Sequence, residues 1–200
     1  MSKVTLVLGD FEGAVEGDVI GVDYGALVCI NKGLSIKLAC GDFDSVTEAE
    51  YEQIKDYADE TIRLKPEKDD TDFYFAYKQC DTYDEILVVG GLGRRRDHEY
   101  TNIITAIMDS RITIVDAQNR IKKYDAGRHS VNKNHYQYFS VMVIEPLTIT
   151  LEGFKYPLYE RSVQFGDTYL TSNEIIGETG IMTLEGGSAL IIQSNEIKKR

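Results

Sequence analysis

Short apolar runs recur through the first half of the chain, separated by more polar segments. Each run is rich in β-branched residues and ends near a glycine, proline or acidic residue, which is typical of a buried β-strand. We expect five such strands, over Val4–Leu8, Ile36–Ala39, Thr61–Leu64, Ile86–Val89 and Ile112–Val115.

Segments with a helical repeat of apolar positions lie between these runs. Thr47 followed by Glu50 forms a capping-box pattern, and Asp70 or Thr71 is suited to cap the next helix. We expect helices over Thr47–Ala58, Thr71–Cys80 and about Asp97–Met108. Alternation of strands and helices predicts a mostly parallel sheet with helices on its faces.

The pattern changes after about Lys122. Short β-branched segments separated by Gly, Pro or Asn turns follow, and no segment has a convincing helical repeat. These segments are Phe139–Ile144, Thr148–Leu151, Ile181–Leu184 and Ala189–Ile192. They predict an antiparallel β-sandwich or partial barrel. We therefore expect an α/β domain over residues 1–124 and a β-sandwich domain over residues 125–200, with the polar stretch Lys122–Asn134 as the linker.

Composition is that of a globular protein, with 42% apolar and 28% charged residues. No apolar run approaches the roughly 18 residues that span a membrane, and Met1–Leu8 lacks the basic start and cleavage site of a signal peptide. Cys29, Cys40 and Cys80 are widely spaced and form no C-x-x-C pair. They predict free thiols in a reducing compartment. We expect a cytoplasmic protein without a membrane partner.

The formal net charge of −11 argues against a nucleic-acid partner, because nucleic-acid phosphates favour basic surfaces. It does not exclude a small polyanion. Clustered carboxylates can hold a divalent cation, and the cation in turn attracts phosphate oxygens.

Two aspartates follow the second predicted strand, in Gly41-Asp42-Phe43-Asp44-Ser45. Ligands of open α/β sheets bind beyond the carboxyl ends of the strands. Asp42 and Asp44 are therefore placed to face one cation, and Mg²⁺ prefers such oxygen ligands. An acidic turn that caps the next helix explains this pentapeptide equally well.

A second acidic cluster, Lys68-Asp69-Asp70-Thr71-Asp72, lies between a strand and a helix. Taken alone, helix capping is the better explanation, because acidic residues complement the dipole at a helix N-terminus. Lys68 beside three aspartates nevertheless suits a metal–phosphate complex. Two acidic clusters at the same edge of a sheet can converge, and together they favour a metal site.

A glycine- and arginine-rich segment, Gly90-Gly91-Leu92-Gly93-Arg94-Arg95-Arg96-Asp97-His98, follows the fourth predicted strand. Glycines let backbone N–H groups approach phosphate oxygens, and arginines bind such oxygens in pairs. The segment contains neither a Walker lysine pattern nor a complete G-x-G-x-x-G. A solvated basic turn is the alternative, but three adjacent arginines in so acidic a chain favour function. His98 alone indicates no proton transfer.

In this order and spacing the three segments resemble the motifs of the thiamine pyrophosphokinase family. That family shows G-D-x-D-S, then K-D-x-T-D, then G-G-x-G-G-R-x-D-H with an asparagine four residues later, here Asn102. Its E-G-x-x-Y-P-L and S-N-E segments are similar to Glu152–Leu158 and Ser172–Glu174. Asp23 and Gly25 stand where the family has an aspartate and a glycine near the nucleotide.

The resemblance implies transfer of a diphosphate from ATP to thiamine by a homodimer, in a cleft between the α/β domain of one subunit and the sandwich of the other. Residues 1–124 would then bind ATP and Mg²⁺, and residues 125–200 thiamine. Asp42, Asp44 and Asp72 would hold Mg²⁺ and act in catalysis together with Arg95. Ser172 and Asn173 of the partner subunit would recognise thiamine. The residues implied near ATP or its phosphates are Asp23, Lys68, Thr71, Gly91, Gly93, Arg95, Asp97, His98 and Asn102.

The chain departs from the family motif at two positions. Arg94 stands where the family has a glycine, and Arg96 where an apolar residue is usual. Arg94 therefore adds a side chain and a charge to the predicted phosphate-binding turn. The chain also has no tryptophan, so any aromatic stacking on thiamine must come from Tyr or Phe.

Three other functions remain open. Asp42–Val46 fits the D-x-D-x-[TV] motif of haloacid-dehalogenase-type phosphatases, with Asp42 as nucleophile, but this leaves the sandwich half unexplained. A pyrophosphokinase for another alcohol, such as a pterin, is the second. A nucleotide-binding or thiamine-sensing module without turnover is the third. AMP that appears only in the presence of thiamine would distinguish a thiamine pyrophosphokinase from these three alternatives.

Overall fold

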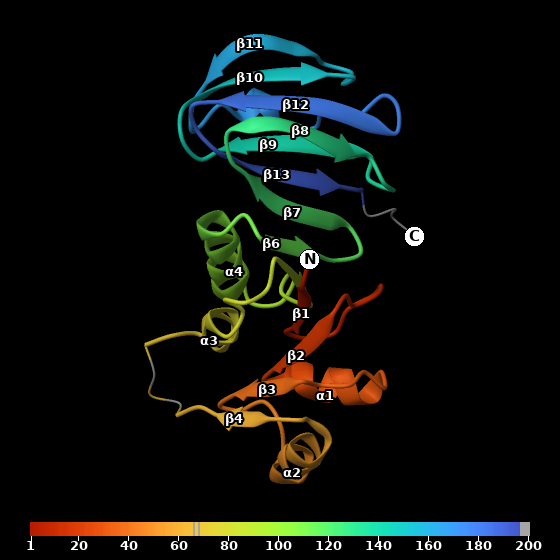
Figure 1. The fold of residues 1–200 in the computed structure, drawn as a ribbon, viewed down its shortest axis with the longest axis vertical. Coiled ribbons are helices and arrows are strands. Elements are labelled where there is room, and N and C mark those ends of the chain that lie inside the picture. Colours follow the sequence, from red (N-terminus) through yellow and green to blue (C-terminus); the bar gives the residue numbers. More distant parts are fainter. Residues whose placement is uncertain (66, 68, 197–200) are drawn as a thin grey trace. The chain divides into compact units, whose positions relative to one another are not determined.

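The computed structural model describes residues 1–65, 67 and 69–196. The chain forms two compact units. The first unit comprises Met1–Thr105 with Arg111–Ala117, and the second comprises Ala106–Ser110 with the chain from Gln118 onward. Figure 1 shows the first unit in red to green and most of the second in green to blue.

The first unit contains a parallel sheet in the order β4-β3-β2-β1-β5-β6. Its strands are β1 (Lys3–Val7), β2 (Asp18–Val22), β3 (Leu38–Gly41), β4 (Thr61–Arg63), β5 (Glu85–Val89) and β6 (Ile112–Val115). The helices in the connections are α1 (Tyr24–Asn31), α2 (Glu48–Tyr57), α3 (Asp72–Lys78) and α4 (Arg96–Met108). Strands β2 to β4 are added on one side of β1 and strands β5 and β6 on the other, so the strand order reverses between β1 and β5. Because all six strands are parallel, the loops that follow them lie at one edge of the sheet, where ligands of such folds bind.

The sequence-based expectations for this unit are confirmed for every predicted strand and helix, with ends that shift by no more than two residues. The capping box at α2 is present, since the Glu50 N–H donates to Thr47 Oγ1 at 3.3 Å and the Thr47 N–H donates to Glu50 Oε2 at 2.7 Å. Strand β2 and helix α1 were not predicted. Helix α1 is buried from Gly25 to Cys29 and lacks a polar face, so its sequence has no amphipathic period.

The second unit is a β-sandwich. Three of its strands pair in the order β7-β13-β9, and four form a sheet in the order β11-β10-β12-β8. Neighbouring strands within each of these groups are antiparallel. The strands are β7 (Asn119–Tyr124), β8 (Gly127–Asn132), β9 (Tyr138–Val143), β10 (Leu147–Glu152), β11 (Leu158–Val163), β12 (Thr179–Glu185) and β13 (Ala189–Ser194), and η1 (Thr168–Leu170) is a short 3-10 helix. Side chains of both sheets share one core, in which the Phe139 and Phe154 rings lie 4.7 Å apart. The predicted fold class is therefore confirmed.

The predicted linker over Lys122–Asn134 is wrong. Strand β7 continues to Tyr124, and β8 occupies most of the remaining stretch. β8 forms an edge of its sheet and buries only Val131 fully, with its other positions half-buried or exposed. A polar edge strand of this kind cannot be told from a linker by its sequence, because few of its side chains are buried. Only its backbone hydrogen bonds to the neighbouring strand identify it.

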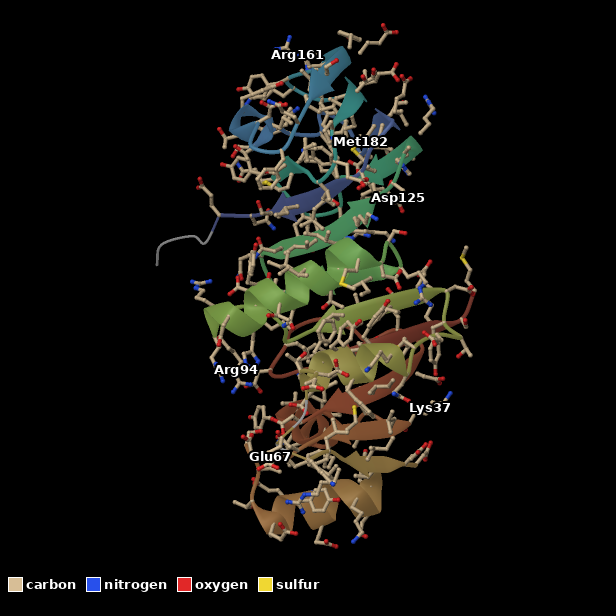
Figure 2. All side chains as sticks on the ribbon, turned by 90° about the vertical axis from the view of Figure 1, so that its left-hand side faces the viewer. Lys37, Glu67, Arg94, Asp125, Arg161 and Met182 are labelled. Carbon is tan, nitrogen blue, oxygen red and sulfur yellow. The ribbon has the colours of Figure 1, made fainter. Side chains whose placement is uncertain are left out.

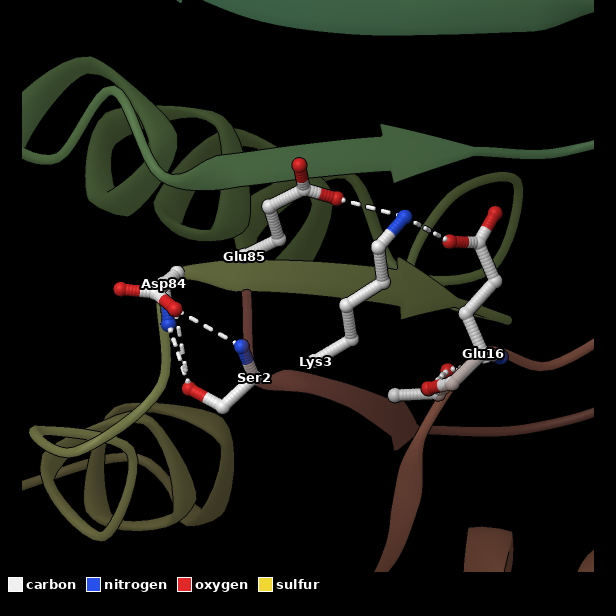
Figure 3. Close-up of polar contacts among 6 residues, drawn as sticks. Ser2, Lys3, Glu16, Asp84 and Glu85 are labelled. Atoms are coloured by element: carbon white, nitrogen blue, oxygen red, sulfur yellow. Dashed lines mark hydrogen bonds and ion pairs between the residues drawn. The ribbon is translucent and has the colours of Figure 1, made fainter.

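Ionic contacts tie the amino ends of the central strands together (Figure 3). Lys3 Nζ lies 2.8 Å from Glu16 Oε2 and 2.9 Å from Glu85 Oε2, and the Ser2 N–H donates to Asp84 Oδ2 at 2.7 Å. Such exposed pairs contribute only about 0–1 kcal/mol each. They occupy the amino edge of the parallel sheet, which leaves the carboxyl edge for ligands.

Among the described helices, none combines the length and the apolar character needed to cross a membrane.

Candidate functional site

A cavity of about 480 Å³ lies at the carboxyl edge of the parallel sheet. Five connections of the first unit line it: those after β1, β2, β3, β4 and β5. Most of the residues predicted from the sequence to bind metal or nucleotide lie in its wall. They are Asp23, Asp42, Asp44, Thr71, Asp72, Gly91, Arg95, His98 and Asn102.

Three carboxylates converge in this cavity. Asp23, Asp42 and Asp44 each offer one oxygen, and these oxygens all lie within 4.8 Å of one another. Asp23 was expected near the nucleotide, not among the metal ligands, so the structure adds it to the pair predicted from the D-x-D motif. Asp72 lines the same cavity but is not part of this closest group. Its predicted role as a metal ligand stays a prediction.

The backbone explains why the D-x-D aspartates face the cavity. Phe43 has a φ of 58° and is 2% exposed, with its ring 5.1 Å from the Tyr51 ring. Its burial in the core anchors the loop and leaves the flanking Asp42 and Asp44 outside. Gly41 has a φ of 153°, and a Cβ there would lie 3.0 Å from Asp23 Cα. The end of β3 therefore packs directly against Asp23, which only glycine allows.

Asp23 carries the clearest electrostatic signature. Its N–H donates to the Cys40 carbonyl at 2.8 Å, and its Oδ2 accepts a hydrogen bond from the Ser45 hydroxyl. Its Oδ1 is buried without a hydrogen-bond partner in the part of the chain that the structure describes. Burial raises the pKa of Asp23, and the charges of Asp72 and Asp44 raise it further. A buried, partnerless carboxylate oxygen among like charges fits a divalent cation.

We expect Asp23→Asn to raise the melting temperature by a few degrees at pH 7 in EDTA. The raised pKa means that the charged carboxylate disfavours the folded state above that pKa, and the neutral amide removes this cost. The gain should fade as pH falls below the unfolded aspartate pKa of about 3.9, where wild-type Asp23 is also neutral. Calorimetric scans repeated at intervals of about one pH unit between pH 3 and 8 measure the difference in melting temperature between the variant and wild type.

Asp18→Asn is the matched control, because Asp18 begins β2 and Asp23 directly follows that strand. Lys37, 2.5 Å away, and the Tyr83 hydroxyl lower the pKa of Asp18, so the charged form favours folding. The substitution should therefore lower the melting temperature at pH 7, with the difference lost as pH falls through the lowered pKa. Equal signs for the two variants would refute the electrostatic account of Asp23.

The loop after β5 is held in shape by its own glycines and by Asn102. Gly90 has a φ of 69°, and a Cβ there would lie 2.4 Å from the Gly9 carbonyl oxygen, so this loop packs against the loop after β1. The buried Asn102 donates from Nδ2 to the Gly91 carbonyl at 2.8 Å. Asn102 thus fixes one end of the predicted phosphate-binding turn.

Two predicted phosphate contacts from this loop do not line the cavity. The Gly93 N–H donates to Glu99 Oε2 at 3.4 Å, so a carboxylate of the chain occupies this amide. Asp97 accepts from Arg95 Nη2 at 2.6 Å and from the His98 N–H at 3.0 Å. The Arg95 guanidinium lowers the pKa of Asp97 to about 2, so this exposed pair stays ionised at neutral pH. The roles of Gly93 and Asp97 toward phosphate stay predictions.

The acidic segment before α3 is described only in part. Thr71 Oγ1 accepts the Tyr74 N–H at 3.1 Å and so caps α3, which makes Thr71 the cap out of the two residues, Asp70 and Thr71, that the sequence offered. Asp72 is the first residue of the helix. Lys68 lies outside the described residues, and its predicted contact with ATP stays a prediction.

Ser172 and Asn173 lie in the second unit. Ser172 has a φ of 60°, and its N–H donates to Ser140 Oγ at 3.0 Å. Asn173 is 7% exposed, and its amide brackets Tyr156: the Tyr156 N–H donates to Oδ1 at 3.0 Å, and Nδ2 donates to the Tyr156 carbonyl at 2.8 Å. Oδ1 also accepts the Glu174 N–H at 2.9 Å. Asn173 therefore organises the backbone of its own unit, and its contact with thiamine stays a prediction.

A small, mostly apolar cavity of about 270 Å³ adjoins this amide. Tyr156, Tyr169 and Leu170 contribute to its wall, together with Asn173. Sequence reasoning did not find it, because its residues come from separate turns of the sandwich. The only signal was the absence of tryptophan, which left Tyr and Phe as the possible aromatic contacts.

We expect Asn173→Ala to lower the free energy of unfolding by about 1–2 kcal/mol, because it leaves two part-buried N–H donors and one part-buried carbonyl without their hydrogen-bond partner. Urea unfolding followed by tyrosine fluorescence measures the change. Asn132→Ala is the control: Asn132 is exposed, and among the described residues its side chain accepts one hydrogen bond, from the Thr179 hydroxyl at 3.1 Å. It should cost less than about 1 kcal/mol. Equal costs would show that the Asn173 bracket adds nothing.

Comparison with known proteins gives one consistent family. The family model "Thiamin pyrophosphokinase, catalytic domain" matches residues 16–115, and "Thiamin pyrophosphokinase, vitamin B1 binding domain" matches residues 128–188. The chain is 32% identical over 189 residues to thiamine pyrophosphokinase of Bacillus subtilis (strain 168), covering 88% of this chain and 87% of that protein.

Two crystal structures resemble the fold over almost the full length. A thiamine pyrophosphokinase from Bacillus subtilis and a thiamin pyrophosphokinase family protein from Enterococcus faecalis each superpose with a TM-score of 0.87. Each is 27% identical to this chain and covers 98% of it, and the match spans 100% of the compared chain. The motifs, the two units and these similarities agree, and the chain belongs to the thiamine pyrophosphokinase family.

Proposed function

We propose that this chain transfers a diphosphate group from ATP to the hydroxyl group of thiamine, giving thiamine diphosphate and AMP. The observation that carries the proposal is a single cavity that holds both the carboxylates Asp23, Asp42 and Asp44 and the guanidinium of Arg95. Such a combination suits a metal-bound polyphosphate. Family membership supports ATP as donor and thiamine as acceptor.

The reaction forms one bond and breaks one. The hydroxyl oxygen of thiamine bonds to the β-phosphorus of ATP, and the bond between that phosphorus and the α,β-bridging oxygen breaks. AMP leaves with the bridging oxygen, and the hydroxyl proton passes to a base. Transfer of this kind is catalysed mainly by alignment of the reacting groups and by neutralising charge on the phosphate oxygens.

Mg²⁺ is the proposed cation, held by Asp42, Asp44 and Asp72 with Asp23 as an additional ligand. The donors are all carboxylate oxygens, which Mg²⁺ prefers, and Asp23 Oδ1 lacks a hydrogen-bond partner among the described residues. When bound, the cation would offset the negative charge of the phosphate oxygens. The chain itself holds these carboxylates close together: Gly41 and the buried Phe43 shape the loop, and Ser45 orients Asp23.

The loop after β5 provides the remaining contacts to phosphate in this proposal. Asn102 holds the Gly91 carbonyl, which keeps the turn in one conformation before the nucleotide arrives. Arg95 lines the cavity, and its pairing with Asp97 limits the directions in which the guanidinium can point. A preorganised turn reduces the entropy lost on binding.

In this proposal, the second unit provides the residues that bind thiamine and the surface through which two copies of the chain form a homodimer. Large apolar side chains are exposed between β10 and β12: Tyr156 at 59%, Tyr159 at 73%, Phe165 at 81%, Tyr169 at 55% and Ile176 at 70%. Such a concentration within one segment supports a surface that a second copy of the chain covers.

We also propose that the protein works in the cytoplasm, which the three buried free cysteines support.

One assay tests the proposed function against its alternatives. Purified protein is incubated with ATP and Mg²⁺, with and without thiamine, and nucleotides are separated by ion exchange. The expected result is AMP and thiamine diphosphate in equal amounts, only when thiamine is present. Phosphate release without thiamine would instead identify a phosphatase, AMP only with a pterin alcohol another pyrophosphokinase, and no turnover a binding module. Sedimentation equilibrium tests the dimer, and a monomer mass would contradict it.

A further inference from the structure

Arg94 differs from the two arginines that follow it. Arg95 pairs with Asp97 at 2.6 Å, and Arg96 pairs with Glu99 at 2.8 Å. Arg94 forms no ion pair with any carboxylate of the described residues, although the cavity that it lines is rich in carboxylates. Its charge is therefore not neutralised by its own chain. An unneutralised guanidinium in a ligand cavity is suited to bind an anion.

Two contacts define where the Arg94 side chain lies. Its guanidinium carbon lies 5.4 Å from the centroid of the Tyr24 ring, which is cation–π geometry. Its Nη1 lies 3.2 Å from the position that a Cβ on Gly9 would take, and its Cδ lies 3.8 Å from the same point. The side chain thus passes over the bare backbone of Gly9. In Figure 2, Arg94 is labelled at the N-terminal end of α4.

Tyr24 connects this arrangement to the carboxylates. It follows Asp23 directly and begins α1. A cation–π contact uses none of the N–H donors of a guanidinium as hydrogen bonds, so these donors remain available to a ligand. Tyr24 therefore restrains Arg94 beside the carboxylate group without consuming its hydrogen-bond donors.

We propose that Arg94 binds phosphate oxygens of the nucleotide and that Tyr24 is its positioning residue. This inference rests on the proposed function for the identity of the nucleotide. It adds a guanidinium at a position where the family motif has glycine, so this chain contacts the polyphosphate with a side chain where its relatives' motif offers only backbone. Arg94 thereby sets part of the affinity for ATP.

Direct binding of inorganic tripolyphosphate in the presence of Mg²⁺, measured by titration calorimetry, tests the inference without turnover. Arg94→Gly restores the residue of the family motif, so the loop has a backbone-compatible replacement. It should weaken binding about tenfold or more, the range for losing a hydrogen bond to a charged group. Arg96→Ala is the matched control, since Arg96 is paired with Glu99 and does not line the cavity. It should change binding by less than about twofold.

A double-mutant cycle tests the positioning role of Tyr24. Tyr24→Leu should weaken tripolyphosphate binding severalfold in the wild-type background and have no further effect in the Arg94→Gly background. Tyr24→Phe, which keeps an aromatic face, should bind nearly as wild type does. Equal effects of Tyr24→Leu in both backgrounds would overturn the positioning role.

Steady-state kinetics give a second readout. Arg94→Gly should raise KM for ATP and leave KM for thiamine unchanged, because only the nucleotide contacts Arg94. Unchanged tripolyphosphate binding by Arg94→Gly, or none by wild type, would overturn the inference. Weakened binding by Arg94→Gly in a protein that releases no AMP would uphold it and refute the proposed transferase activity.

Discussion

Asp44→Asn lowers thiamine-dependent AMP release by about a thousandfold or more while the protein remains folded. Asparagine keeps the shape of the side chain but removes the charge from a group of three carboxylates whose oxygens lie within 4.8 Å of one another. A neutral amide is a much weaker ligand for Mg²⁺ than a carboxylate. The melting temperature in EDTA should stay level or rise, because one like-charge repulsion disappears.

Asp56→Asn serves as the control for this substitution, since Asp56 is exposed on α2 and does not line the cavity. Its AMP release should match that of wild type. Titration of Mg²⁺ adds a second measurement: higher Mg²⁺ should restore part of the activity of Asp44→Asn. Near-normal activity of Asp44→Asn at low Mg²⁺ would remove the carboxylate group from the reaction.

Gly25→Ala lowers the free energy of unfolding by about 3 kcal/mol and abolishes activity with it. A Cβ on Gly25 would lie 1.8 Å from the carbonyl oxygen of Val7, which is backbone and cannot move aside as a side chain can. Helix α1 must therefore shift away from β1. Asp23 and Tyr24 immediately precede Gly25, so the shift also displaces one carboxylate of the site.

Gly177→Ala is the comparison that isolates this effect. Gly177 has no atom within 4 Å of its Cβ position and no left-handed φ, so alanine fits there. Its stability should be unchanged or rise by about 0.4–1 kcal/mol through the unfolded state. Urea unfolding followed by circular dichroism measures both variants, and activity is assayed at a temperature where both are folded. A Gly25→Ala protein as stable as Gly177→Ala would show that α1 packs less tightly on β1 than these distances require.

The sequence located the D-x-D pair and Asp72 at one edge because the carboxyl ends of parallel strands meet there. It did not find Asp23 as the third member of the closest carboxylate group. Asp23 follows β2, a strand that contains Gly21, and precedes α1, a helix without a polar face; neither element has a clear period. The convergence of Asp23 with Asp42 depends on the close packing at Gly41, which spacing along the chain does not encode.

The sandwich half was predictable as a class but not in its details. Alternating β-branched segments identified β9, β10, β12 and β13, whose inward positions form the core. Strands β7, β8 and β11 went unrecognised, because only one position of each is fully buried. The bracket that Asn173 forms around Tyr156 joins residues 17 positions apart, so only the folded chain reveals it.

Phe43 has a consequence for how this protein can change over evolutionary time. Its burial between Asp42 and Asp44 makes the spacing of the motif part of the core, since inserting or deleting one residue there would direct a carboxylate inward and a phenyl ring outward. Substitution of an exposed residue that does not line the cavity, such as Arg96, leaves the length of this loop unchanged and carries no such penalty. The length of the D-x-D loop is therefore constrained by the packing of the core as well as by the site, whereas the charge at an exposed position such as 96 is constrained by neither.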